Sequence, residues 1–274
     1  MVLAKSQIVT MKVVVQNLQK RSHLASDLID EYDPDLLLAQ EISLYSEEKV
    51  LFGDDRMACN VYEWVGYGTA IWTKLPATLV NIRRVDSPYA DFGFIYKKTT
   101  IATYELNYSA AATACVSRNK ADEKAEEEEE EEEEEIVSES AAPEMEVVSF
   151  HGYNGQPWKS LEKLLAHVTA VIAVLSSDPD SLALFAGDFN TWSQHHIDAV
   201  TAELANCGFR HAFSWPYPGR ELPLDHVFIR GDALQADSLK VFSNKSDHKG
   251  AVFDLMLLSS KPTMSKDRNA ESKL

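Results

Sequence analysis

The stretch from Leu184 to Thr191, LFAGDFNT, constrains the fold most, because an apolar run stops there at a polar pair. The run from Leu182 to Ala186 predicts a buried strand, and Gly187 permits a sharp turn at its end. Residues i and i+2 of a strand point the same way, so we expect Asp188 and Asn190 to face one spot. Taken alone, these residues fit an Asx turn that merely closes the strand equally well.

The same pattern, an apolar strand-like run with a polar residue at one end, recurs along the chain. The recurring polar residues are Asn17, Glu41, His151, Asp225, Asp247 and His248. A β-scaffold brings the ends of its strands to common rims. We therefore expect these side chains to converge on one site, although a single strand-end residue such as Glu41 would more often be an ordinary exposed one.

The apolar spacing predicts few helices and many short strands. Helices are expected over residues 19–32, 158–175 and 193–207, with Ser193 as an N-cap of the last. Strands are expected over residues 12–16, 35–41, 57–65, 69–74, 79–85, 92–97, 100–106, 144–150, 182–186, 223–229, 239–242 and 251–258.

Composition indicates an ordinary globular chain, with 45% hydrophobic residues in 274. Its apolar runs are shorter than the ~18–20 residues of a membrane helix, and the first residues lack a signal-peptide pattern. The three cysteines are too far apart for a disulfide framework or a zinc knuckle. We expect an intracellular protein, cytoplasmic or nuclear, without membrane insertion and monomeric.

One segment carries most of the negative charge. Residues 120–146 hold fifteen acidic residues and two lysines, a local charge of −13, which leaves −4 of the total −17 for the rest of the chain. The segment has little to bury, so residues 107–143 are expected to form a disordered loop. Because its flanks resemble two strands of one hairpin, we expect an insertion into a single domain of residues 1–258, followed by a polar tail, 259–274.

The polar residues suit metal-assisted phosphodiester cleavage, which needs a cation at the phosphate and a group that orients water. Glu41 and Asp247 are oxygen ligands of the kind that Mg²⁺ or Mn²⁺ prefers. His248 could contact the scissile phosphate or accept a proton. Asp247 does not orient its neighbour His248, since adjacent strand residues face opposite ways; Asp225 or another carboxylate would do so.

Seven motifs in order resemble the endonuclease/exonuclease/phosphatase superfamily, which includes pancreatic-type deoxyribonuclease and exonuclease III-like enzymes. The motifs are VVVQN, DPDLLLAQE, GTAIWTK, VVSFH, GDFN, LDHVF and SDH, spanning roughly residues 10–257. The resemblance implies an α/β fold, a four-layer α-β-β-α sandwich of two mixed, mostly antiparallel sheets with outer helices. It also implies a metal-dependent phosphodiesterase or phosphatase.

The resemblance also implies roles for the residues at the strand ends. On the metal side, Glu41 would be the principal ligand, with Asn17 beside it and Asp247 as a further carboxylate. Asp188 would orient or deprotonate the attacking water, and Asn190 would help to hold that water and the phosphate.

The remaining implied roles concern histidines. His151 would lie near the phosphate or the leaving group, His248 would contact the phosphate, and Asp225 would support one of the catalytic histidines. The cofactor implied is Mg²⁺, with Mn²⁺ as an alternative.

Three functions fit these residues. We favour a nuclease that cuts DNA or RNA with the help of a divalent metal. A phosphatase or phosphodiesterase acting on a small or lipid phosphate, such as an inositol phosphate, is the alternative. A non-catalytic protein that binds a basic partner through the glutamate run 126–135 belongs to another class.

Some residues have two interpretations. Tyr153, Trp158 and Trp192 could stack on a base, but packing under the loops is the better interpretation. His195, His196 and the pair His211 with Cys207 suggest zinc only weakly, because their spacing does not match a closed site.

Overall fold

The structure is a computed structural model, and it describes residues 8–43, 57–62, 67–74, 77–91, 93–106, 142–155 and 159–258. Along the chain the elements are β1 (Ile8–Asn17), α1 (His23–Tyr32), β2 (Leu36–Ser43), β3 (Met57–Val61), β4 (Tyr67–Thr73), β5 (Ala77–Asp91), β6 (Ile95–Leu106), β7 (Glu144–His151), α4 (Leu161–Ile172), β8 (Leu182–Asp188), α5 (Gln194–Ala205), β9 (Arg210–Pro216), β10 (Pro223–Arg230), β11 (Leu234–Phe242) and β12 (Gly250–Leu258). The acidic segment at 107–141, Trp158 and the tail 259–274 lie outside the described residues.

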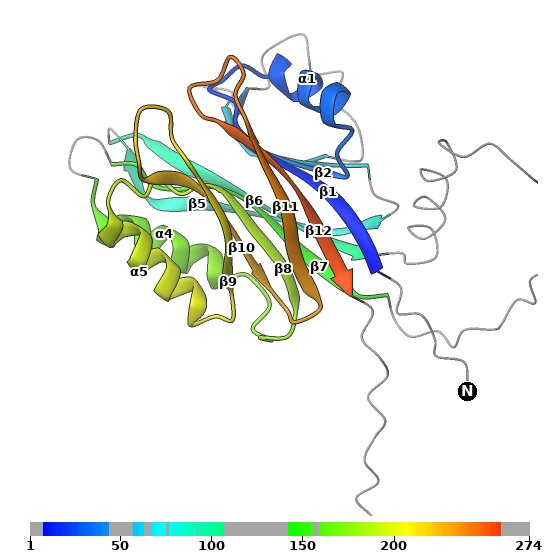
Figure 1. The fold of residues 1–274 in the computed structure, drawn as a ribbon. Coiled ribbons are helices and arrows are strands. Elements are labelled where there is room, and N and C mark those ends of the chain that lie inside the picture. The colour runs from blue at the N-terminus through cyan, green and yellow to red at the C-terminus, as the bar shows by residue number, and fades with distance from the viewer. Residues whose placement is uncertain are drawn as a thin grey trace, which may run out of the picture.

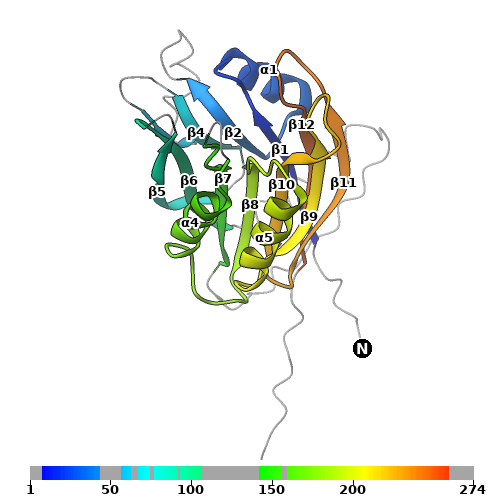
Figure 2. The same cartoon turned by 90° about the vertical axis from the view of Figure 1, so that its left-hand side faces the viewer.

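The strands form two six-stranded sheets, which we name sheet A and sheet B. Sheet A has the order β11-β12-β1-β2-β4-β3, and sheet B has the order β5-β6-β7-β8-β10-β9. Among the strands that the structure describes, only the β1–β2 and β7–β8 pairs are parallel. Helix α1 covers the outer face of sheet A, and α4 and α5 cover the outer face of sheet B (Figures 1 and 2). The predicted four-layer sandwich of mixed, mostly antiparallel sheets is confirmed.

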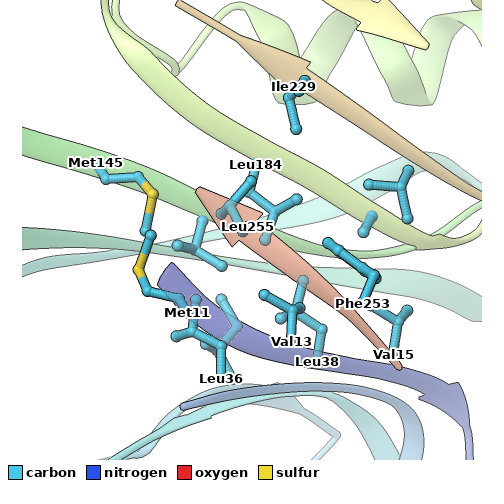
Figure 3. Close-up of a cluster of buried hydrophobic side chains, with 14 of the residues drawn as sticks. Met11, Val13, Val15, Leu36, Leu38, Met145, Leu184, Ile229, Phe253 and Leu255 are labelled. Carbon is cyan, nitrogen blue, oxygen red and sulfur yellow. The ribbon is translucent and has the colours of Figure 1, made fainter. Parts of the chain in front are cut away.

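Side chains that point alternately inward and outward along the central strands explain the layers. Met11, Val13 and Val15 of β1 point into the core between the sheets, while Val14 points out to α1. Strand β2 repeats this, with Leu36 and Leu38 inward. Figure 3 shows these residues meeting side chains of sheet B across the sandwich. Strands buried on both faces need unbroken apolar runs, which is why runs such as VVV mark the centre of each sheet.

The helices begin and end close to their predicted bounds. The hydroxyl of Ser160 caps α4 by accepting from the Lys163 amide, and Ser193 caps α5 by accepting from the His196 amide, as predicted for Ser193. Helix α1 starts only at His23, because Gln19 and Lys20 before it have positive φ angles of 49° and 61°.

Several strand predictions need correction. Residues 92–97 and 100–106 do not form two strands, because Ile95 to Leu106 is continuous in β6 and pairs with a long β5. Strand β9 was not predicted, since it is an edge strand with few buried residues. The predicted hairpin around the acidic segment is confirmed: Thr99 to Glu105 pairs antiparallel with Glu144 to Phe150. No helix among the described residues is long and apolar enough to cross a membrane.

Gly187 is required for a reason other than the predicted turn. It lies inside β8, paired with Phe150 of β7 and His226 of β10. Its φ is 141°, and a Cβ there would lie 2.1 Å from the Phe150 carbonyl oxygen. Close approach of the neighbouring strand, rather than chain reversal, therefore selects glycine at this position.

Candidate active site

The predicted site residues meet at one edge of the sandwich. The parallel strands β1, β2, β7 and β8 present their carboxyl ends there, and the antiparallel strands β10 and β12 begin there. The side chains that this arrangement brings together are Asn17, Glu41, His151, Asp188, Asn190, Asp225 and His248. Because sheet A supplies some of them and sheet B the others, the site exists only while the two sheets stay aligned.

Asp188 lies at the centre of this group and is 2% exposed. Its Oδ2 accepts a hydrogen bond from the Asn17 amide at 3.1 Å. The same oxygen lies 3.6 Å from Nε2 of His151 and 3.6 Å from Nε2 of His248. Burial raises the pKa of Asp188, and the nearby His248 cation opposes that rise. A carboxylate with a raised pKa is suited to accept a proton.

Asn190 reaches the site by a geometry that differs from the predicted strand alternation. Strand β8 ends at Asp188, and Asn190 has a left-handed φ of 55°. Its backbone amide donates to Oδ1 of Asp188 at 2.9 Å, and its side-chain amide donates to the Gly152 carbonyl at 3.0 Å. The turn thus fixes the Asp188 carboxylate, as an Asx turn does, while it also brings Asn190 beside the site.

His248 and Asp225 form a buried pair across the two sheets. Oδ2 of Asp225 lies 2.9 Å from Nδ1 of His248, and Asp225 is 0% exposed. Burial lowers the pKa of His248, but the Asp225 and Asp188 carboxylates raise it to about 10. His248 is therefore an imidazolium at neutral pH, with Nδ1 donating to Asp225 and Nε2–H available to an anion.

Glu41 is directed into the site by an irregularity of β2. The pairing of β2 with β4 shifts register between Gln40 and Ile42, and Glu41 has a φ of 50°. Such a bulge redirects a side chain. Oε1 of Glu41 lies 3.6 Å from Nε2 of His151. Non-glycine residues in this conformation are uncommon and tend to occur at functional sites.

Lys97 of β6 is a site residue that the sequence patterns did not indicate. It is 8% exposed, and its Nζ lies 2.8 Å from Nε2 of His151 and 3.7 Å from Oδ2 of Asp91. Burial and then the Lys97 charge hold the pKa of His151 well below its usual value, so His151 is neutral. Because an ammonium can only donate, Nε2 of His151 accepts and Nδ1 carries the proton.

The donor set fits a divalent cation. Oε1 of Glu41 and Oδ2 of Asp188 are electron-pair donors, and each lies 3.6 Å from Nε2 of His151. Carboxylate oxygens of Asp188 and Asp225 lie within 4.8 Å of each other and of the protonated His248 ring, the one acid and histidine cluster of this kind in the described ranges. Oδ1 of Asp225 is buried and has no hydrogen-bond partner. Oxygen donors of this kind match Mg²⁺ or Mn²⁺.

The other candidates lie at the edge of this cluster or outside it. Asp247, predicted as a metal ligand, is exposed, and its Oδ2 lies 3.5 Å from the hydroxyl of Tyr217. Tyr153 is 6% exposed and packs against Tyr89 at 6.5 Å between ring centroids, as a structural residue would. Trp192, in contrast, is only half-buried.

Comparison with known families and structures identifies the family and the fold. A profile of the endonuclease/exonuclease/phosphatase family matches residues 15–248. The chain belongs to this family. The buried cluster of Asp188, Asp225 and His248 lies within the matched residues.

Solved structures agree with the family assignment at the level of the fold. TDP2 of Caenorhabditis elegans superposes with a TM-score of 0.60 and 12% identity, over 91% of this chain and 74% of that one. The catalytic domain of human Nocturnin, solved with bound sulfate, gives 0.59 and 15% identity, over 93% and 97%. A family member from Bacteroides vulgatus gives 0.60 and 13%, over 90% and 99%.

Curated relatives match over a shorter stretch. A UPF0294 protein of Vibrio vulnificus strain YJ016 is 34% identical over 115 residues, 40% of this chain and 39% of that protein. A UPF0294 protein of Vibrio parahaemolyticus is 30% identical over 122 residues, 43% of this chain and 42% of that protein. The match thus covers less than half the length of these relatives.

Proposed function

We propose that the chain is a metal-dependent nuclease that hydrolyses phosphodiester bonds of DNA or RNA. The observation that carries the proposal is the convergence on Oδ2 of Asp188, where the Asn17 amide lies at 3.1 Å and His151 and His248 at 3.6 Å. A buried carboxylate with a raised pKa, beside an imidazolium and a neutral imidazole, supplies a proton acceptor and an anion-binding group within one site.

In this mechanism Asp188 holds the attacking water, and Asn17 and the Asn190 amide hold Asp188. The water oxygen forms the new bond to phosphorus while its proton passes to Asp188. The bond from phosphorus to the leaving oxygen breaks on the opposite side, and that oxygen takes up a proton from solvent. Nε2–H of His248 donates to a phosphate oxygen, and Asp225 keeps His248 protonated and oriented.

Glu41 and Asn17, together with the unpaired Oδ1 of Asp225, are the residues of this chain that would hold Mg²⁺ or Mn²⁺. A bound divalent ion neutralises charge on the phosphate and lowers the pKa of bound water. Lys97 adds a fixed positive charge at the same place, through its contact with His151. Asp247 could add a carboxylate from the exposed side.

The direct test is phosphate-ester hydrolysis with Mg²⁺, with Mn²⁺ and with EDTA. The substrates are plasmid DNA, single-stranded DNA, RNA and an inositol phosphate. Asp188→Ala and His248→Ala should each lower kcat by about 100-fold or more, since general acid–base groups contribute about that much. Asp180→Ala, which changes an exposed aspartate before β8, is the matched control and should keep wild-type activity.

The outcomes separate the alternatives. Metal-dependent cutting of a polynucleotide that Asp188→Ala loses supports the nuclease. Hydrolysis of the inositol phosphate alone would place the chain among the phosphatases. Activity that survives in EDTA, or that Asp188→Ala retains, would refute the mechanism.

A further inference from the structure

Beside the catalytic residues lies a second cluster, made of Lys159, Trp192 and Arg220, which we name the cationic cluster. Nζ of Lys159 lies 2.7 Å from the centroid of the Trp192 ring, and the Arg220 guanidinium carbon lies 4.6 Å from it. Arg220 also donates to the Trp192 carbonyl at 3.0 Å. Two cations from separate loops are thus gathered on one half-buried indole ring.

Neither cation has an acidic partner among the described residues. No described carboxylate oxygen lies within 4.0 Å of Lys159 or Arg220, whereas Lys97 and Arg230 each have one. Burial and then the charge of Arg220 lower the pKa of Lys159 to about 8. Two like charges held together without a carboxylate in contact repel each other, and an anion between them would remove that cost.

The cationic cluster is continuous with the catalytic site. Trp192 follows Asn190 by two residues, and its indole N–H donates to Asn154 at 2.9 Å. The Trp192 ring lies 6.4 Å from the ring of Tyr217, which in turn lies 4.8 Å from the ring of His248. The Asp188 carboxylate acts on Lys159 as well, opposing the fall in its pKa.

Lys159 is held in place by the backbone. It has a positive φ of 45°, and its amide donates to the Gly155 carbonyl at 2.8 Å, just before α4 begins. This left-handed conformation is uncommon for lysine. The loop between β7 and α4 therefore sets the direction in which the Lys159 side chain leaves the backbone, and the Trp192 ring places its ammonium.

We propose that Lys159 and Arg220 bind the phosphate next to the scissile one in a polynucleotide strand, with the Trp192 ring as the floor of this subsite. The proposal rests on the proposed nuclease function. It restricts the substrate of the nuclease to strands that carry a second phosphate next to the scissile one. Basic groups beside aromatic rings are the usual means of holding a single strand. When the phosphate draws the two cations to itself, the indole face becomes open to a base.

The test uses tetranucleotides whose central linkage is the scissile one. Mass spectrometry of the products measures cleavage at that linkage. A methylphosphonate placed on the 5′ or the 3′ side of that linkage removes the neighbouring charge but keeps the bases. For the wild type, kcat/KM should fall about ten-fold or more when the charge is removed on one side only. In the double variant Lys159→Gln/Arg220→Gln the same replacement should cost less than about two-fold.

Controls separate binding from folding. Lys240→Gln changes an exposed lysine of β11 and should behave as the wild type. Trp192→Phe keeps a ring and should retain most activity, whereas Trp192→Ala should lose about 5- to 150-fold on base-bearing strands. Equal losses of activity in both Trp192 variants would show that the indole acts by holding the loop through its hydrogen bond to Asn154. The indole would then not belong to the subsite.

The subsite is refuted if the methylphosphonate leaves kcat/KM of the wild type unchanged, or if it lowers kcat/KM of the double variant as much as that of the wild type. Another outcome is that an inositol bisphosphate inhibits the wild type but not the double variant, while the charged and methylphosphonate tetranucleotides are cleaved with equal kcat/KM. In that case the subsite binds a small bisphosphate and not a polynucleotide. A wild type that cleaves no strand refutes the nuclease. Anisotropy of the labelled tetranucleotides on Asp188→Asn then still decides whether the neighbouring phosphate is bound.

Discussion

Replacing Asp225 with asparagine should lower the pKa of His248 and move the alkaline limit of activity. Asp225 is fully buried, and its Oδ2 lies 2.9 Å from Nδ1 of His248. Burial lowers the pKa of His248, and Asp225 is the strongest of the groups that raise it to about 10. Asparagine keeps the shape and can still accept a hydrogen bond, but it removes the charge.

The size of the effect follows from the hydrogen bond. A hydrogen bond to a charged group contributes about 1.5–3 kcal/mol, which corresponds to a pKa change of about 1–2 units. Wild-type His248 holds its proton up to about pH 10 when folded, against 6.5 when unfolded. Its stabilisation is therefore complete below pH 6.5 and is lost as pH rises from 6.5 to 10. In Asp225→Asn this loss ends at a lower pH.

Imidazole NMR titration of His248 in EDTA measures the shift directly, and urea unfolding between pH 6 and pH 10 measures the linked stability. The basic limb of the pH–rate profile should move by the same amount. Asp247→Asn is the matched control, because Asp247 is exposed and is the weakest named contributor to the His248 pKa. A wild-type His248 that titrates near 6.5, or equal shifts in both variants, would refute the reasoning.

Two further predictions concern stability. Glu146 pairs with Arg230 at 3.0 Å, and Arg230 is 2% exposed, so Glu146→Ala should cost about 3–5 kcal/mol in urea unfolding. The exposed neighbour Glu144→Gln should cost less than about 0.5 kcal/mol, and equal costs would contradict the burial argument. Burial lowers the pKa of His167 and of His226 to about 3, so each should destabilise the fold by about 2 kcal/mol at pH 5 relative to pH 8. A flat unfolding profile over that range, apart from carboxylate effects below pH 5, would show that these histidines are protonated in the folded state.

The strand-end pattern located most of the site for a geometric reason. Asn17 and His151 end strands that each have a parallel neighbour, so Glu41 and Asp188 follow at the same edge. Antiparallel strands that return to that edge must begin there, which places Asp225 beside Asp188 in register. The convergence could be predicted from the apolar runs and the directions of the strands. The order of the strands in each sheet was not needed.

Residues whose position depends on long-range packing were not predictable in this way. Lys97 lies next to Lys98 in a strand, and local pattern gave no reason to bury either. The hairpin register does contain the signal, because Thr99 pairs with Phe150 and so brings Lys97 near His151. Lys159 and Arg220 come from loops more than fifty residues apart in sequence, and only the folded chain brings both to Trp192.

The alignment of the two sheets at the site depends on polar contacts in the sandwich interior. Hydrophobic burial is not directional, so the core residues of Figure 3 hold the sheets together without setting their relative position to a fraction of an ångström. Near the site Gln40 of β2 donates to the Ser149 hydroxyl of β7 at 3.0 Å, and Ser149 donates to the Ala39 carbonyl at 3.1 Å. Hydrogen bonds require defined distances and angles. These bonds lie one residue before Glu41 and two before His151, so they set the sheet register where Glu41 must meet His151.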